Sequence, residues 1–155
     1  MKAKDYNGNI KVYSQVPKTY NNIINFHLLS DSELESHGFY DVNTPSYNSN
    51  TQELGAIEWD ADNSRFTYPV SDKTWSKTLA EMKSSKIANL KAIYNSKLAT
   101  TDWYVVREAE GGTALPSDIA TERGNLRTEC ATKEGEINSK TTKAQVADYS
   151  LPNLD

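Results

Sequence analysis

The amino-acid sequence changes character near residue 70, and this change limits the available folds more than any other feature. Ten of the 15 aromatic residues precede it, together with many turn-forming residues, as is typical of short strands and partly buried loops. Lys, Ala, Glu and Leu dominate the remainder. We therefore predict an α+β protein with a small mixed head over 1–70, containing short strands, a β-hairpin and one short helix. A C-terminal helical hairpin over 71–155 follows, and we expect one cooperative unit.

Three local patterns define the expected elements of the head. Residues 9–16 alternate in hydropathy after an Asn-Gly-Asn turn signal, which predicts a short strand. Ser30 and Glu33 have the spacing of a capping box, which predicts a short helix over about 31–37. Two β-rich runs flank the polar segment 61–64, which predicts a hairpin.

The tail begins with a pattern that predicts one long amphipathic helix, capped by Ser71 or Asp72. Lysines, serines and asparagines fill its solvated face. Its apolar positions form one broad stripe: Trp75, Leu79, Met82, Ile87, Leu90, Ile93, Tyr94 and Leu98.

A second helix is expected after the double glycine at 111–112, with Pro116 in its first position. Its strongly apolar residues form a narrow seam that permits pairing within the chain or between chains: Ile119, Leu126, Cys130 and Ile137. Gly124 and Gly135 lie inside this helix, where they either allow close helix approach or reflect an unoptimised sequence. The last segment, from residue 141, predicts a short helix whose apolar residues dock on the hairpin or meet a partner.

Charge and composition exclude several classes of function. A net charge of −4 and a pI near 5.2 argue against nucleic-acid binding. No apolar run approaches the roughly 20 residues that cross a bilayer, so we expect no membrane partner. The N-terminus resembles neither a secretory signal nor a transit peptide, so we expect the protein to act where it is made. A single cysteine allows neither an intrachain disulfide nor a set of cysteine zinc ligands.

The residues that could act in catalysis or metal binding are expected to have structural roles. The common nucleotide, hydrolase and metalloprotease motifs are absent from the sequence, so we predict no catalytic, cofactor-binding or metal-binding residues and no enzyme activity. His27 and His37 are expected to be structural, as is Cys130 on the apolar seam. The alternative from another class is a small hydrolase that uses Glu108 or Glu110.

The segment 103–107 reads Trp-Tyr-Val-Val-Arg between the two helices and has two interpretations. It is either a hydrophobic plug of the hairpin, with Asp102 capping and Arg107 paired to an acidic neighbour, or a patch that binds a partner. The candidate partner-binding residues are Trp103, Tyr104, Val106, Arg107, Leu126, Tyr149 and Leu151.

The order of segments resembles small tailed-bacteriophage proteins described as tail fibre assembly proteins or tail assembly chaperones. In the head, the resemblance rests on 28–34, 38–42, 45–48 and 67–70. In the tail, Leu98 to Trp103, Pro116 and Arg123 to Arg127 are similar to the family's L-x-x-[ST]-D-W … P … R-x-x-[IL]-R signature. The chain departs from many members at 122–127, where they carry Tyr-Arg-Gln-Ala-Leu-Arg, and at its end, where they carry Phe-Pro and Trp-Pro.

The resemblance implies a non-enzymatic protein that binds a phage tail or tail-fibre subunit. It acts either transiently as an assembly chaperone in the host cytoplasm or permanently as a structural component of the virion tail or baseplate. Association of copies through the tail helices is a further expectation.

Overall fold

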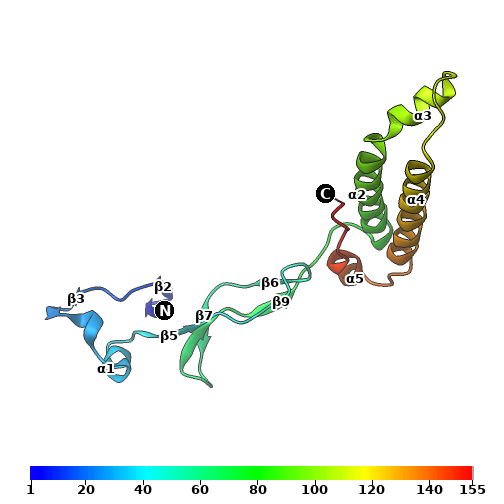
Figure 1. The fold of residues 1–155 in the computed structure, drawn as a ribbon. Coiled ribbons are helices and arrows are strands. Elements are labelled where there is room, and N and C mark those ends of the chain that lie inside the picture. The colour runs from blue at the N-terminus through cyan, green and yellow to red at the C-terminus, as the bar shows by residue number, and fades with distance from the viewer. Residues whose placement is uncertain (155) are drawn as a thin grey trace. The chain divides into compact units, whose positions relative to one another are not determined.

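The computed structural model describes residues 1–154 and divides them into two compact units, one over Met1–Lys73 and one from Thr74 onward. The predicted α+β class is confirmed, since strands in small sheets come first and long helices follow (Figure 1). The division falls at Lys73 and Thr74, whereas the sequence analysis placed it at residue 70.

A hairpin opens the first unit. Strands β1 (Lys2–Tyr6) and β2 (Asn9–Tyr13) pair antiparallel around Asn7 and Gly8, whose φ angles are 57° and 91°. Two consecutive positive φ angles are what a two-residue turn between twisted strands requires, and Asn-Gly adopts them at low cost. The predicted strand at 9–16 thus exists but ends at Tyr13. The partner strand β1 was not predicted, because charged residues interrupt its hydropathy pattern.

The main sheet has five strands in the order β2-β1-β5-β8-β7. Its central strand β5 (Tyr40–Asn43) pairs antiparallel with β1 and parallel with β8 (Arg65–Thr67). Strand β7 (Glu58–Asp60) pairs antiparallel with β8, which confirms the predicted hairpin with shorter strands.

Shorter elements complete the first unit. Helix α1 (Asp31–Ser36) begins at the predicted capping box, in which Ser30 and Glu33 exchange hydrogen bonds. It ends before Gly38, whose φ of 82° favours glycine. The remaining elements are β3 (Thr19–Tyr20), β4 (Ile23–Ile24), the 3-10 helix η1 (Phe26–Leu28), β6 (Gln52–Leu54) and β9 (Val70–Asp72).

The core of the first unit is small and aromatic. Phe26, Leu34 and Phe39 are buried together, and Tyr13 and Tyr20 pack around them. The rings meet mostly at tilted or edge-to-face angles, the geometry that aromatic quadrupoles favour.

The second unit is built on helices α2 (Leu79–Ala99) and α4 (Ser117–Asn138), which pack side by side within one chain (Figure 1). Their shared core consists of Leu90, Tyr94 and Ile137, with Leu126 and Cys130 packed against it. The apolar stripe of α2 and the apolar seam of α4 therefore meet in a helical hairpin within one chain. Helix α3 (Asp102–Ala109) lies at one end of this pair and α5 (Lys143–Asp148) at the other.

The predicted start of the first long helix at Ser71 or Asp72 is wrong. Residues 70–72 form strand β9, and α2 begins at Leu79 behind a capping box of Thr78 and Glu81. Thr78 accepts a hydrogen bond from the Glu81 amide, and Glu81 accepts one from the Thr78 amide at 2.7 Å. Trp75 thus precedes the helix and is not part of its stripe.

Two expectations for α4 need correction. Pro116 was expected in the first position of the helix, but it is the N-cap residue, and the helix begins at Ser117. A β-carbon added at Gly124 or Gly135 would meet no atom within 4 Å, so neither glycine serves close helix approach.

The end of the chain docks on the helix pair. Val146 on α5 is buried, while Tyr149, Leu151 and Leu154 pack against the core of Leu90, Tyr94 and Ile137. Tyr149 Oη also donates a hydrogen bond to Glu136 Oε2 at 2.7 Å. The docking alternative of the sequence analysis is therefore confirmed.

Candidate partner-binding site

Helix α3 carries an unusually exposed apolar surface. It has no buried residue, and 53% of Trp103 and 53% of Val106 are solvent-accessible. We call Trp103, Tyr104, Val105, Val106 and Arg107 the tip patch. Trp103, Val105 and Val106 are exposed and Tyr104 and Arg107 are only partly buried, so the segment does not form a buried hydrophobic plug.

The aromatic part of the tip patch is ordered by stacking. The Trp103 and Tyr104 rings lie 3.7 Å apart between centroids, and the Arg107 guanidinium carbon lies 4.9 Å and 5.2 Å from them. A guanidinium over electron-rich rings is attracted to their faces. Arg107 was expected to pair with an acidic neighbour, but its Nε instead donates to the Thr113 carbonyl at 3.2 Å.

A glycine turn closes the helix beneath Arg107. Gly111 has a φ of 82°, and the Gly112 amide donates to the Arg107 carbonyl at 2.9 Å. A β-carbon on Gly112 would lie 2.9 Å from both the Arg107 carbonyl oxygen and its Cγ. Only glycine fits there without displacing Arg107.

A buried arginine holds α3 on the helix pair. Arg123 of α4 is 6% exposed, and its Nη1 donates to the Leu98 carbonyl at 2.7 Å and to Thr101 Oγ1 at 2.6 Å. Its Nη2 binds Asp102 Oδ1 at 2.7 Å. We call these four residues the Arg123 clamp. Asp102 therefore pairs with Arg123, and the expected capping by its side chain is absent, since α3 has no side-chain cap.

The clamp consists of residues from the signature quoted in the sequence analysis. Leu98, Thr101, Asp102 and Arg123 are separated by up to 25 residues and converge on one guanidinium. The planar fork of arginine suits such convergence, because its donors point in fixed directions. This positioning role of Arg123 was not predicted from the sequence.

The structure brings together only some of the predicted partner-binding residues. Trp103, Tyr104, Val106 and Arg107 share α3, together with Val105, which is 37% exposed and was not among the predicted residues. The others pack against the core of the helix pair and do not belong to the tip patch: Leu126, Tyr149 and Leu151.

The other candidate residues occupy varied surroundings. The ring of His37 packs against Tyr20 and Phe26, whereas His27 is exposed. Cys130 lies on the seam, where burial raises the pKa of its thiol. Glu108 and Glu110 are exposed at the end of α3.

No group of three or more metal-ligating His, Cys, Asp or Glu side chains occurs within residues 1–154. None of the helices described is both long and apolar enough to cross a membrane. Comparisons with protein-family models, with curated proteins and with solved structures return no match for this chain.

Proposed function

We propose that this protein binds a phage tail or tail-fibre subunit through the tip patch and assists its assembly, without catalysis. The observation that carries the proposal is the exposed Trp103–Val106 surface on a helix fixed by a buried arginine. Aromatic residues and arginine are the types that dominate binding energy at protein interfaces.

The fixed position of α3 supports a role in partner binding for its exposed apolar side chains. A mobile apolar segment loses conformational entropy when it binds, whereas a held helix has lost it already. The Arg123 clamp and the Gly111–Gly112 turn restrain the two ends of α3. The tip patch is thus presented in an ordered form before any partner arrives.

The sequence resemblance adds the class of partner. The residues similar to the phage family's signature include the four that form the clamp and Trp103 of the tip patch. The function implied by that resemblance therefore involves the same part of the molecule.

Site-specific photo-crosslinking in infected cells tests the proposal. A photoreactive phenylalanine analogue at position 103 or 106 is expected to give a covalent product with a tail or tail-fibre subunit, identified by mass spectrometry. Trp59 provides the matched control, because it is a tryptophan of similar exposure, 43%, in the other unit. Products only with proteins outside the tail, or the same product from positions 59 and 103, would contradict the proposal.

The duration of binding separates two forms of this function. Stoichiometric amounts of the protein in purified particles would favour a permanent tail or baseplate component. Its absence from particles, together with crosslinks in infected cells, would favour a transient assembly chaperone acting in the host cytoplasm.

A further inference from the structure

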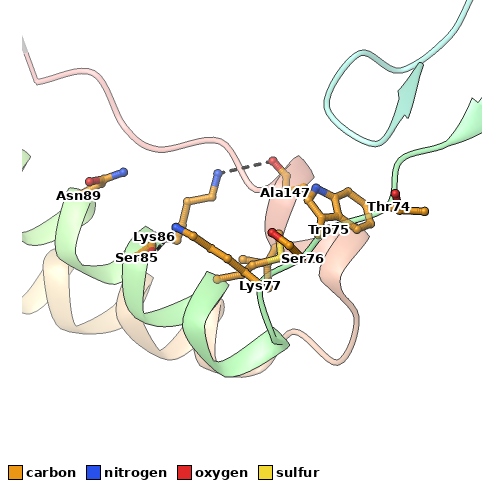
Figure 2. Close-up of a pocket in the computed structure, with 10 residues that line it drawn as sticks. Thr74, Trp75, Ser76, Lys77, Ser85, Lys86, Asn89 and Ala147 are labelled. Carbon is orange, nitrogen blue, oxygen red and sulfur yellow. Dashed lines mark hydrogen bonds between the residues drawn. The ribbon is translucent and has the colours of Figure 1, made fainter. Parts of the chain in front are cut away.

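A pocket of about 390 Å³ lies in the second unit, among the start of α2, helix α5 and the segment 74–77 (Figure 2). This volume falls within the range of sites that take small ligands or a peptide side chain. The pocket does not include any residue of the tip patch.

One side of the pocket is apolar. Trp75, Met82 and Val146 contribute to its lining, and Figure 2 shows the Trp75 indole across the pocket from Ser85. The backbone of Trp75 is tied to α5, because Lys143 Nζ donates a hydrogen bond to the Trp75 carbonyl at 3.0 Å. The pocket wall is therefore positioned by a contact between α5 and the segment that precedes α2.

The other side of the pocket carries positive charge and hydrogen-bonding groups. Lys77 and Lys86 line it, and none of the described lining residues is acidic. Lys77 Nζ lies 3.4 Å from Ser85 Oγ, and Lys86 Nζ lies 3.4 Å from the Ala147 carbonyl (Figure 2). Each ammonium has three donors, and these long contacts engage only one of them.

The carboxylate of Glu81, which lies near these lysines in the sequence, does not occupy their remaining hydrogen-bond donors. Hydrogen bonds from the Thr78 amide and hydroxyl lower the pKa of Glu81, with further attraction from Lys77 and Lys143. Its Oε2 atom accepts both Thr78 bonds, at 2.7 and 2.8 Å, and closes the capping box. Glu81 is thus engaged at the helix end and is not among the residues that line the pocket.

We propose that this pocket binds the C-terminal carboxylate of a polypeptide whose last side chain is apolar. The last residue of such a polypeptide carries its carboxylate and its apolar side chain on one α-carbon. These two groups match the two lysines and the apolar wall of the pocket. An internal aspartate or glutamate supplies the charge without the apolar group. Ser85 and Asn89, four positions apart on the same face of α2, offer hydrogen bonds to the adjoining peptide backbone.

The test uses the full-length protein and three short peptides. The probe is acetyl-glycyl-glycyl-leucine with a free carboxylate, compared with its C-terminal amide and with a version that ends in serine. Two-dimensional NMR follows the indole N–H signals of the three tryptophans, and a Trp75→Phe variant assigns the one at the pocket.

The free acid is expected to shift the Trp75 indole signal in a saturable way at millimolar concentration, leaving the Trp59 and Trp103 signals unchanged. The amide should bind about tenfold more weakly, because charge-assisted hydrogen bonds are lost. The serine version should also bind more weakly. Lys77→Gln and Lys86→Gln should each weaken binding several-fold, whereas Lys97→Gln, the same change near the other end of α2, should not.

Two results would overturn this inference. A Trp75 signal that does not saturate would show that the pocket does not bind such a chain end. Equal binding of the acid and the amide would show that the pocket recognises only the apolar side chain. Both titrations use the unaltered protein, the Trp75→Phe variant serves only to assign the indole signal, and neither result depends on the function proposed for the tip patch.

Discussion

Arg123 of α4 donates from Nη2 to Asp102 Oδ1 of α3 at 2.7 Å, across 21 residues of sequence. The arginine side chain is 7% exposed and that of the aspartate is 58% exposed, so the pair lies at the boundary between core and solvent. Water screens the aspartate side of this ion pair. The inner hydrogen bonds of Arg123, to Leu98 and Thr101, therefore contribute more to the stability of the clamp than the charge pair does.

Replacing Arg123 with alanine should lower the free energy of unfolding of the helical unit by about 2 to 3 kcal/mol. The loss comes from charge-assisted hydrogen bonds to groups that are partly buried. Urea unfolding followed by far-UV circular dichroism measures it. Arg127→Ala is the matched control, because Arg127 is exposed one turn further along α4 and should change stability by less than about 0.5 kcal/mol.

Trp103→Ala should leave the fold intact while removing the crosslinks and binding attributed to the tip patch. Trp103 is 53% exposed on a helix without buried residues, so truncation opens no cavity. Leu90→Ala, at a fully buried position, should instead cost about 3 kcal/mol. Thermal unfolding of both variants distinguishes these effects, and a large stability loss in Trp103→Ala would contradict the exposed placement.

Thr78→Ala should destabilise the start of α2 by about 1 kcal/mol, because it removes the capping hydrogen bond to the Glu81 amide. Faster amide hydrogen exchange in the first turn of α2 would report the loss. Asp72→Ala tests the alternative start suggested by the sequence. Because Asp72 lies in β9, this change should not alter exchange in α2.

The helical unit should lose stability at alkaline pH through two tyrosines. Burial, together with nearby Glu129, raises the pKa of Tyr94 to about 12, and burial with the Glu136 hydrogen bond does the same for Tyr149. Both hydroxyls bind their protons more tightly when folded, so this contribution is complete below pH 10 and is lost as pH rises towards 12. Urea unfolding between these pH values measures the decline. The Tyr94→Phe/Tyr149→Phe double variant should show a smaller one, and an equal decline would contradict the assignment.

Alanine at Gly124 or Gly135 should stabilise α4 by roughly 0.5 to 1 kcal/mol at each site. Both positions are helical, and an added β-carbon meets no atom within 4 Å. Thermal unfolding of the single variants provides the measurement. A destabilising effect at either glycine would indicate a close contact at that position that the structure does not contain.

The parts of the fold that local chemistry determines were predictable from sequence. The capping box of Ser30 and Glu33 and the hairpin at 58–67 depend on neighbouring residues, and both were predicted. The parallel pairing of β5 with β8 joins Val42 to Phe66, and no local pattern encodes such a pairing. At the start of α2, a second possible cap at Ser71 and Asp72 competed with Thr78, and the pairing of β9 with β6 decided between them.

The candidate site, like the fold, was predictable only where local sequence determines it. The aromatic segment Trp103–Arg107 was visible as a run of residue types, but its exposure and the stacking of Arg107 depend on tertiary structure. The clamp was not predicted, because Arg123 looks like an ordinary surface arginine until Leu98 and Thr101 are brought to it. Leu126 and Tyr149 were misleading candidates for the opposite reason, since an apolar side chain suits a core as well as an interface.

The central position of β5 has a consequence for how the chain folds during translation. Its two neighbours are β1, near the start of the chain, and β8, which ends at Thr67. The ribosome must release β8 before β5 is paired on both sides, so the edge of β5 that later binds β8 stays unpaired while the segment between them is made. A β5 strand with a free edge is a point where a nascent chain can associate wrongly with another copy, and slow translation between residues 43 and 65 would lengthen that exposure.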